Sequence, residues 1–542
     1  MALGALMLAL PVMAQLDNTV EVTNEVKPVT NDVKKVDVKA KAAETKVKHY
    51  TMQYAVQEQP LNNYAEESLG SYESEEVWKG RKNGYVHLGG GNQGNVDGQA
   101  VYRLDVTERD AMTVDLSLKG FNGRVKDEDF FGIKGWKARD YRNRAAFKYN
   151  HRLESGTDVF AKGYYENHLY NYAGAKCNDK QHDIMAGAEA GFSPLEFGDL
   201  KVDANAGIDF FCQRYATMLP KKLKETVLHL DANASYRLSD EHGLGLGLGV
   251  FGSSYANDEL KGVTSLRFTP HYLYSTEPLD VKLGLFVSSL GNVAPDVELV
   301  YHLTPESDVY AQVTGGEEDN TLSAFAHDHT YFMLDATKDE RMEIRPLFTQ
   351  VEANVGCRFK SNFGLSGNIG LGFERSYNAI DVDDLTMAPD GRLGTVVNLV
   401  HSRAYTINAD VCYSYKDIFK LDTSQELELE KCKEDGGRWI KGCLCSPLFA
   451  MNWQADVKLM KDLYLGLNWD FAMYRLEKEG DEPQYERPNT ANLGASLRYT
   501  LPVEMPLTLF VKGDNLLNRA NDRYASYRSL GTTFTAGFAM SF

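Results

Sequence analysis

The chain has 542 residues, a net charge of −18 and a mean hydropathy of −0.39. The excess of acidic residues argues against a nucleic-acid-binding protein, because neutralising phosphates requires clustered Lys and Arg. The low mean hydropathy fits a soluble protein, but it fits a transmembrane β-barrel equally well, since only alternate strand residues of a barrel face lipid. The 30 Tyr and 25 Phe residues also fit both classes.

Residues 1–14 are predicted to be a signal peptide. An apolar run from Leu3 to Met13 has the right length, and Val12-Met13-Ala14 before Gln15 has the small-residue pattern of a cleavage site. No Lys or Arg precedes the run, so we expect the natural start of the signal to lie further upstream. No other stretch approaches the roughly 18 apolar residues of a membrane-spanning helix. An exported chain of this kind can cross a membrane only as a closed barrel.

The next segment, residues 15–82, is predicted to be an extended N-terminal arm in the periplasm. From Val20 to Val47 it is rich in Val, Lys and Thr and poor in aromatic residues, and this composition supplies no packed core. From Gly84 onward the pattern changes to successive strands joined by turns. We therefore predict an all-β barrel domain over residues 83–542.

Strands in this domain are recognised by a period of two. Residues 463–473 are a clear example, with apolar side chains at every odd position and Tyr464, Asn468 and Asp470 between them. A β-sandwich also alternates, but it does not usually need a dozen or more strands of about 9–11 residues. The same alternation occurs in residues 228–237, 363–374, 451–459 and 493–499.

Short and long connections alternate along the chain, as they do in outer-membrane barrels with short periplasmic turns and long external loops. The count gives a transmembrane antiparallel barrel of about 22 strands, joined by roughly ten tight turns and eleven longer links. Tight turns are predicted at 108–110, 155–156, 239–243, 276–278, 305–307, 361–362, 461–462 and 502–506. Longer links are predicted at 123–138, 170–180, 214–224, 317–342, 378–401, 431–446 and 477–489.

The last strand carries the most specific signal for the compartment. Phe534, Ala536, Phe538, Met540 and Phe542 occupy alternate positions, and small or polar residues lie between them. A terminal strand that is apolar on one face and ends on an aromatic residue is typical of a bacterial outer-membrane barrel. We therefore expect localisation in the outer membrane, contact with its lipid, and engagement of the barrel-assembly machinery through this strand.

The end of the chain also resembles a known family. The run Val511-Lys512-Gly513-Asp514-Asn515-Leu516-Leu517-Asn518-Arg519, followed by Gly531 to Gly537, is similar to the last two strands of TonB-dependent outer-membrane receptors. Thr532 stands where that family often has Arg. Residues 85–104 resemble the first hairpin of short, plug-poor relatives common in Bacteroidota. The resemblance is specific over the final ~40 residues, and an estimate of about 22 strands agrees with it.

The resemblance implies a plug domain and a TonB-contacting box, and the sequence departs from both. A domain of that kind needs on the order of 100 residues, whereas residues 15–82 are fewer and lack a visible core, so no full plug is expected. Thr19-Val20-Glu21-Val22 is only vaguely similar to a TonB box. Contact with TonB or another envelope protein therefore stays open. We expect the arm, the links or a partner to obstruct the lumen.

Seven cysteines in an exported chain favour disulfides over metal binding or catalysis. Cys432, Cys443 and Cys445 belong to one long link, so a bridge from Cys432 to either of the other two is a candidate. Cys177 and Cys212 form a second candidate pair. The odd number leaves at least one cysteine outside intramolecular pairs.

No catalytic, cofactor or metal site is predicted. The Asp381–Gly391 link lacks the Gly that an EF-hand loop needs in its middle and the Glu that closes such a loop. A weak cation site formed by its acidic residues is the one alternative that stays open. His327-Asp328-His329 suggests either metal ligands or an exposed polar loop, and the loop is the simpler interpretation. Charges on the polar faces of strands are expected to line the lumen, namely Asp231, Arg237, Arg358, Asp456, Lys458 and Arg498.

These features predict a barrel that takes up a solute or lets it pass across the outer membrane. Specificity is expected to come from the external links and the lumen charges. The alternative is a non-transporting barrel subunit that serves as a docking scaffold in an outer-membrane complex. A barrel enzyme is not expected, because such enzymes are usually smaller and no catalytic constellation is visible.

Overall fold

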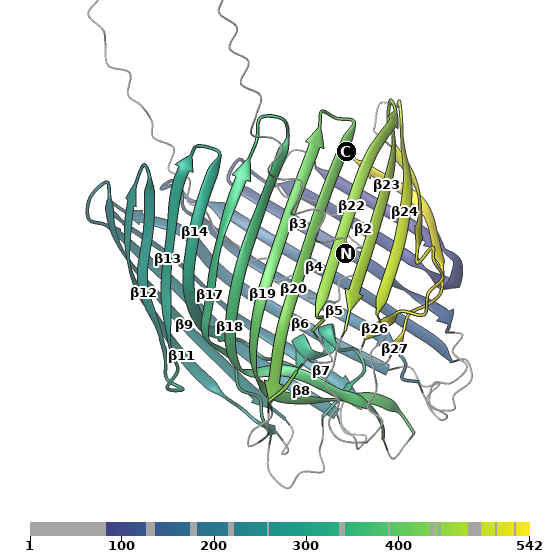
Figure 1. The fold of residues 1–542 in the computed structure, drawn as a ribbon, viewed down its shortest axis with the longest axis horizontal. Coiled ribbons are helices and arrows are strands. Elements are labelled where there is room, and N and C mark those ends of the chain that lie inside the picture. Colours follow the sequence, from purple (N-terminus) through teal and green to yellow (C-terminus); the bar gives the residue numbers. More distant parts are fainter. Residues whose placement is uncertain are drawn as a thin grey trace, which may run out of the picture. The chain divides into compact units, whose positions relative to one another are not determined.

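The alternating segments form the strands of one closed antiparallel β-barrel (Figure 1). The computed structural model describes residues 83–125, 136–173, 181–214, 222–256, 260–334, 342–388, 391–433, 437, 439–441, 446–474, 489–503, 507–524 and 527–542. The predicted signal peptide and N-terminal arm lie outside these residues.

The sheet contains 24 strands. Two of them, β15 (Phe332–Met333) and β21 (Ile440–Lys441), are two-residue strands that belong to links. The other twenty-two form the wall and confirm the predicted strand number. In chain order the wall strands are β1 (Gly84–Gly91), β2 (Val96–Asp105), β3 (Asp110–Arg124), β4 (Lys137–Arg152), β5 (Asp158–Tyr170), β6 (Gln181–Phe197), β7 (Leu200–Arg214), β8 (Lys222–Arg237), β9 (His242–Tyr255), β11 (Thr264–Thr276), β12 (Leu279–Ser288), β13 (Val293–Thr304), β14 (Ser307–Glu318), β17 (Leu347–Lys360), β18 (Leu365–Met387), β19 (Leu393–Tyr415), β20 (Phe419–Lys433), β22 (Phe449–Met460), β23 (Leu463–Met473), β24 (Thr490–Leu501), β25 (Leu507–Asp514) and β28 (Thr533–Ser541).

The wall closes between its first and last strands. β1 pairs antiparallel with β28 from Tyr85 opposite Ser541 to Gly91 opposite Thr535. The carbonyl oxygen of Phe542 accepts hydrogen bonds from the backbone nitrogens of Asn83 and Gly84, at 2.9 and 2.7 Å. Closure of this kind leaves no strand edge unpaired. Phe534, Phe538 and Phe542 are exposed on the outer face of the terminal strand, as their period predicts, and Met540 on the same face is half-buried.

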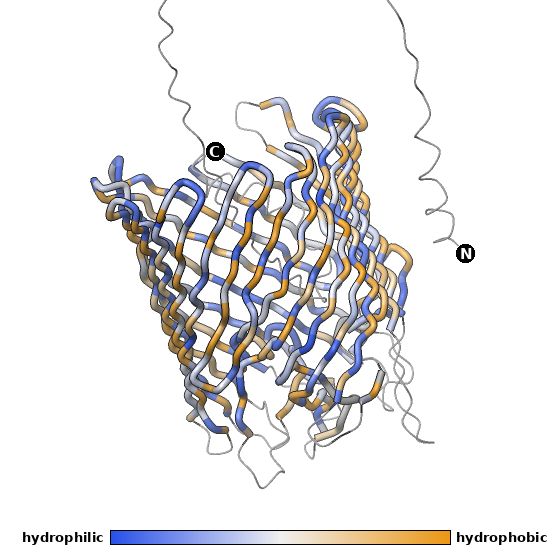
Figure 2. The backbone as a smooth tube through the Cα atoms, turned by 60° about the vertical axis from the view of Figure 1, so that its left-hand side comes forward, coloured by the Kyte–Doolittle hydropathy of each residue, from blue (hydrophilic) through white to orange (hydrophobic). Residues whose placement is uncertain are grey.

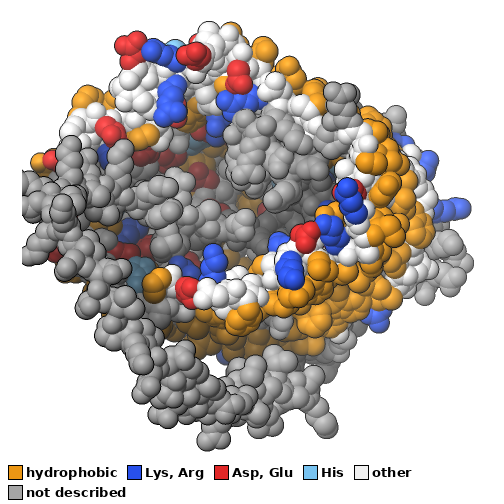
Figure 3. Space-filling view, turned by 90° about the horizontal axis from the view of Figure 1, so that it is seen from above, with side chains coloured by type: hydrophobic (Ala, Val, Ile, Leu, Met, Phe, Trp, Pro, Cys, Tyr) orange, Lys and Arg blue, Asp and Glu red, His pale blue; other side chains and the backbone are white. Residues whose placement is uncertain are grey.

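The outer surface of the wall is apolar, and the polar residues face inward. On β8, Leu228 and Leu230 are 55% and 41% exposed. The tube in Figure 2 alternates between hydrophobic and hydrophilic along many strands. Figure 3 shows hydrophobic side chains over the outer wall and charged ones around the rim and inner wall. Outward apolar residues alternating with inward polar ones are what a transmembrane barrel requires. Among the described residues, no helix is long and apolar enough to span a bilayer.

The two ends of the barrel differ. Tight turns such as 461–462 join strands at one end, which we call the tight-turn end and which lies at the top of Figure 1. The longer connections gather at the other end, which we call the long-link end. They carry the remaining short elements: η1 (Asn92–Gly94), β10 (Leu260–Lys261), α3 (Leu322–Asp328), β16 (Met342–Glu343), β26 (Asp522–Tyr524) and β27 (Tyr527–Arg528).

The link predicted at 378–401 is wrong. The structure continues β18 and β19 through most of it as a hairpin of two 23-residue strands, with a short tip between Met387 and Leu393. Register shifts between Ser376 and Ala379 and between Val382 and Leu385 interrupt the pairing. Asn378 also has a positive φ of 60°. Each bulge reverses which face a residue occupies, and this breaks the period of two in the sequence.

Candidate functional site: a segment packed inside the barrel

The link between β14 and β17 folds into the barrel rather than away from it. Its residues 320–334, here called the luminal segment, contain α3 followed by β15. Thr321 caps the helix, since its side chain accepts a hydrogen bond from the Ala324 nitrogen at 3.1 Å. Leu322, Phe325 and Ala326 lie at i, i+3 and i+4, so they share one face. All three are fully buried, which anchors this short helix through packing.

The luminal segment lies against the β4–β8 side of the wall. β15 pairs with β19, with Phe332 opposite Thr395, and the Tyr172 hydroxyl, just after β5, donates to the Phe332 carbonyl oxygen at 3.1 Å. By pairing order β19 is the eleventh wall strand after β5, so the two strands are diametrically opposed in the wall. The Leu393 nitrogen at the start of β19 nevertheless donates to the Ala173 carbonyl oxygen just after β5, at 2.9 Å. The outer end of the β18–β19 hairpin therefore reaches across the lumen to the β5 side, where it packs on the luminal segment. Figure 1 shows α3 near the long-link end.

A buried carboxylate holds the beginning of α3. Glu225 on β8 accepts hydrogen bonds from the backbone nitrogens of Leu322 at 3.0 Å and Ser323 at 3.3 Å. These nitrogens belong to the first turn of the helix, where backbone donors have no intrahelical partner. Glu225 itself is only 2% exposed. The contact therefore satisfies both the helix donors and a carboxyl group that would be costly to bury without partners.

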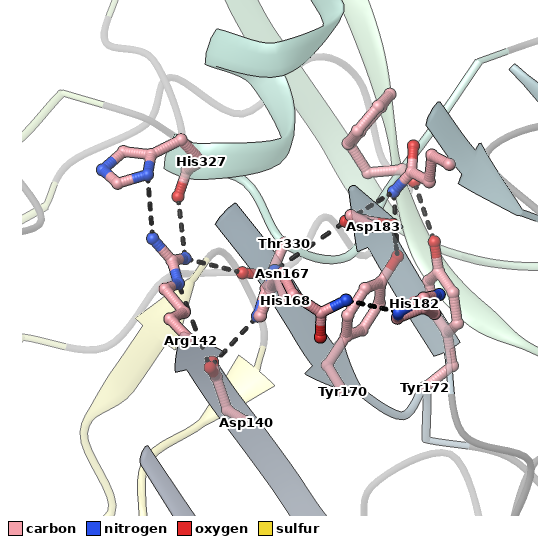
Figure 4. A network of polar contacts seen from close by, with 12 residues as sticks. Asp140, Arg142, Asn167, His168, Tyr170, Tyr172, His182, Asp183, His327 and Thr330 are labelled. Carbon is pink, nitrogen blue, oxygen red and sulfur yellow. Dashed lines mark hydrogen bonds and ion pairs between the residues drawn. The ribbon is translucent and has the colours of Figure 1, made fainter. Parts of the chain in front are cut away.

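An arginine holds the other end of the helix (Figure 4). Arg142 on β4 donates from Nη2 to the His327 carbonyl oxygen at 3.0 Å and to the Thr330 hydroxyl at 3.3 Å. Its Nη1 lies 3.0 Å from His327 Nδ1. A guanidinium has no acceptor, so His327 Nδ1 accepts and the neutral imidazole carries its proton on Nε2. Free carbonyls at a helix end are suited to such a cation.

Behind Arg142 lies a buried row of polar side chains from three neighbouring strands (Figure 4). His168 on β5 has Nε2 at 3.1 Å from Asp140 on β4 and Nδ1 at 3.8 Å from Asp183 on β6. The side chains of all three are at most 2% exposed. Because Arg142 pairs with His168, and His168 with Asp183, strand register alone places these groups side by side. The row supports the guanidinium from the wall side.

An aromatic core joins the luminal segment to other links. Tyr331 stacks on Tyr527, with ring centroids 3.6 Å apart and planes 5° from parallel. Trp136 meets both rings edge-on. The Tyr527 hydroxyl donates to the Leu393 carbonyl and accepts from the Ala173 nitrogen. Five connections therefore share one core, and a change in one is transmitted to the others. Its buried members are Val125, Trp136, Ala138, Tyr170, Tyr172, Ala173, Tyr331, Met333, Ala388, Leu393, Tyr527 and Leu530.

The six charges predicted to line the lumen occupy the strand faces opposite the lipid-facing residues, and the structure brings only some of them together. Asp456 on β22 pairs with Arg498 on β24. Lys458 instead contacts Asp417 in a tight turn. Arg237 pairs with Asp199 at 2.8 Å, with both side chains more than half exposed, near the tight-turn end. Arg358 lies 4.5 Å from the ring centroid of Tyr310, and Asp231 is exposed beside Gly249.

The cysteine predictions are tested only in part, because Cys177, Cys443 and Cys445 lie outside the described residues. Cys432 is buried, and its Sγ lies 3.2 Å from a carboxylate oxygen of Glu430. Cys212 lies on β7 and makes no disulfide with any described residue. The pairings stay predictions.

His327-Asp328-His329 is not a loop, because its first two residues end α3. His327 is exposed, whereas His329 is only 9% exposed. Within the described ranges, no group of three or more His, Cys, Asp or Glu side chains is arranged to hold a metal ion. Sequence reasoning missed Glu225, Arg142 and the Asp140–His168–Asp183 row. Charged residues crowd at the long-link ends of consecutive strands, and this pattern could have indicated the site from the sequence.

The position of His327 makes the luminal segment sensitive to pH. The pKa of His327 falls from 6.5 to about 4. The largest cause is burial by the surrounding walls, which displaces water from the imidazole. The positive charges of Arg142, His168 and Arg144 lower the pKa further, and the Asp140 carboxylate opposes this. A released imidazole takes up a proton below about pH 6.5, and the docked one does so only near pH 4. The contribution of His327 to docking is therefore complete above pH 6.5 and weakens as the pH falls through this window. His327 is exposed, so screening by solvent reduces the effect.

We expect amide hydrogen exchange in residues 320–334 to be faster at pH 5 than at pH 7 after correction for intrinsic rates. The reason is that at pH 5 a released His327 imidazole takes up a proton while the docked one stays neutral beside Arg142, which favours release. His327→Gln keeps a neutral acceptor and should abolish most of the difference. Equal corrected exchange at both pH values in the unmodified protein would contradict the expectation.

Comparison with known proteins was made by sequence and by structure. No protein-family model and no curated protein matches the chain. Solved structures do match. The FrpB iron transporter from Neisseria meningitidis (F5-1 variant) superposes with a TM-score of 0.65 at 9% identity, covering 85% of this chain and 82% of that one. The copper transporter OprC gives 0.60 at 12% identity, with 85% and 81% covered. The ferric enterobactin receptor PfeA from Pseudomonas aeruginosa gives 0.59 at 12%, with 85% and 80% covered.

Proposed function

We propose that this chain, whose fold is that of the TonB-dependent receptor barrels, mediates uptake of a solute across the bacterial outer membrane. Identities of 9–12% support the fold alone. The proposal therefore depends on one observation of this chain: a wall of twenty-two strands that is apolar outside and charged inside. Barrels of that size enclose a lumen wide enough for large solutes, and such lumens are plugged.

The long-link end is the proposed external face, because outer-membrane barrels place their longer loops outside. A solute would first meet the links and then the wall charges, such as the Asp456–Arg498 pair. FrpB is an iron transporter, OprC a copper transporter and PfeA a ferric enterobactin receptor. Metal ions or metal chelates are thus the first solute class to test. Energy coupling through TonB belongs to the same proposal.

The test is accumulation in a Gram-negative host that expresses the full chain, compared with the same host carrying an empty vector. Labelled iron, copper and ferric siderophores, each supplied at limiting concentration, are the probes. Faster accumulation of at least one probe, abolished when the inner membrane is de-energised, is the expected result. Equal accumulation of every probe in both strains would argue against uptake of this class.

A docking scaffold is the second candidate, and the luminal segment favours it. A lumen obstructed near the long-link end by α3 and the β18–β19 hairpin suits a structural subunit better than a pore. Purification from solubilised membranes separates the two functions. A partner retained in stoichiometric amount through successive columns, together with no accumulation of any probe, would support the scaffold.

A further inference from the structure

The outer faces of β18, β19 and β20 leave the lipid region at one common level. These strands lie side by side (Figure 1), and their outward positions are largely apolar from the tight-turn end as far as Phe373, Tyr405 and Leu429. This stretch covers roughly ten residues of each strand. At a strand tilt of about 40° it rises about 25 Å along the axis, which is the height of an apolar band. The Phe373 and Tyr405 rings, with centroids 5.0 Å apart, mark its border as an aromatic girdle does.

The next outward position on each of the three strands is basic. Arg375 on β18 lies opposite Arg403 on β19, and Arg403 lies opposite Lys431 on β20. Because neighbouring strands are about 4.8 Å apart, the three residues form a row about 10 Å long, here called the basic row. Like charges directly opposite one another repel, so the row destabilises the sheet unless an anion neutralises it.

The described part of the chain supplies no anion to the basic row, because none of its three members pairs with a carboxylate there. The adjacent acids Glu374 and Glu430 occupy the inner face of the wall, where Glu430 accepts a hydrogen bond from the Ser402 hydroxyl. The row is therefore open to an anion that approaches from outside the barrel.

Aromatic side chains hold the cations at the lipid border. The Arg403 guanidinium lies 4.2 Å from the ring centroid of Trp439, and the Lys433 ammonium lies 5.3 Å from the same ring. Arg375 lies 5.4 Å from the ring centroid of Tyr377. Such contacts orient a cation but leave its charge unneutralised. The surface thus offers fixed positive charge directly beside an apolar strip, which suits a ligand with an anionic head and an apolar tail.

We propose that the basic row binds the phosphate groups of an outer-leaflet glycolipid of the lipid A type, whose acyl chains lie along the apolar faces of β18, β19 and β20. The assignment rests on the proposed orientation, in which headgroups at the long-link end belong to the outer leaflet. Arginine binds phosphate through two parallel hydrogen bonds, and a row about 10 Å long spans a headgroup with two phosphates better than a headgroup with one. The site lies outside the lumen, so it places no condition on the transported solute.

Native mass spectrometry of the full chain in detergent, titrated with bisphosphorylated lipid A, tests the site. We expect one lipid A to be retained per unmodified barrel. Binding should weaken roughly fivefold in Arg403→Gln and on the order of a hundredfold in the triple variant Arg375→Gln/Arg403→Gln/Lys431→Gln, because each surface cation adds a similar increment of attraction. Lys224→Gln is the matched control and should bind normally. It removes an exposed outward cation at the long-link end of β8, whose register partner is Cys212.

The chemistry of the lipid is tested on the unmodified chain. Dephosphorylated lipid A should bind no better than intact lipid A binds to the triple variant, and phosphatidylglycerol, with one phosphate, should bind weakly. Excess inorganic phosphate should not displace lipid A. Equal binding of phosphatidylglycerol would overturn the assignment to the glycolipid, and displacement by inorganic phosphate would show a site for a free anion instead.

Cold SDS gels show whether each variant is folded. Should the triple variant not fold, Arg403→Gln and the dephosphorylated lipid carry the test. Undiminished binding of lipid A to folded variants, or equal binding of its dephosphorylated form, overturns the inference. Neither result touches uptake, which the accumulation assay judges separately. Failure of accumulation with phosphate-dependent lipid binding intact would overturn the uptake function and leave the lipid site in place.

Discussion

Replacing Gly91 by valine will prevent the barrel from closing. Gly91 is the last residue of β1 in the pairing with β28. A Cβ added there would lie 1.7 Å from the Phe534 carbonyl oxygen, and that neighbour is backbone in the partner strand. No side-chain rotation relieves such a clash, so the two strands must separate. An open seam exposes unpaired backbone groups to lipid, each at a cost of several kcal/mol.

Gly90→Val is the matched control. The neighbouring glycine lies one position earlier in the same strand, and a Cβ there meets nothing closer than the Asn95 carbonyl oxygen at 4.0 Å. The readout is the shift between folded and heat-unfolded mobility on cold SDS gels, together with the amount in the outer-membrane fraction. We expect near-complete loss of the folded band for Gly91→Val and little change for Gly90→Val. Equal folding of both variants would mean that the seam tolerates the added methyl groups.

Replacing Glu317 by alanine will cost the folded barrel about 3–5 kcal/mol. The Glu317 side chain is fully buried on β14, and its carboxylate accepts hydrogen bonds from Arg267, Ser265, Ser288 and Asn292. Removing it leaves four donors from β11, β12 and the following turn without their shared acceptor. Arg267 keeps a contact with Asp319, which limits the loss at that residue.

Equilibrium unfolding in detergent micelles, followed by tryptophan fluorescence, measures this change. Glu306→Ala is the control, because that carboxylate lies exposed in the tight turn before β14. A surface change of this type is expected to stay within about 0.5 kcal/mol. A Glu317→Ala loss no larger than that of Glu306→Ala would show that water replaces the carboxylate at this site.

The barrel wall could be predicted because its signal is local. Leu228 and Leu230 face lipid for a reason visible in residues 228–237 alone: successive side chains of a strand point to opposite faces. The terminal strand is a second case, since Phe534 and Phe542 are exposed on the face that their spacing assigns. Strand number followed from the alternation of short and long connections, and it is confirmed.

The luminal segment could not be predicted because its signal is not local. Leu322, Phe325 and Ala326 suggest a short helix at most, and seven residues are too few for a helix that is stable alone. What holds it are contacts from Glu225, 97 residues away, and Arg142, 185 residues away. The period of two predicts which face of β4 and β8 those charged side chains occupy. It does not predict which link they contact, because that depends on closure of the whole wall.

The long β18–β19 hairpin covers the mouth of the barrel. Its strands of 23 residues are longer than the apolar band of about 25 Å requires. The excess folds inward, because Ala388 and Leu393 at the tip are buried in the aromatic core and Val397 packs with Met185, Phe211 and Leu223. With the long-link end facing the medium, an antibody, a bacteriophage or a toxin approaching the cell would meet the outer face of this hairpin and not the charges beneath it.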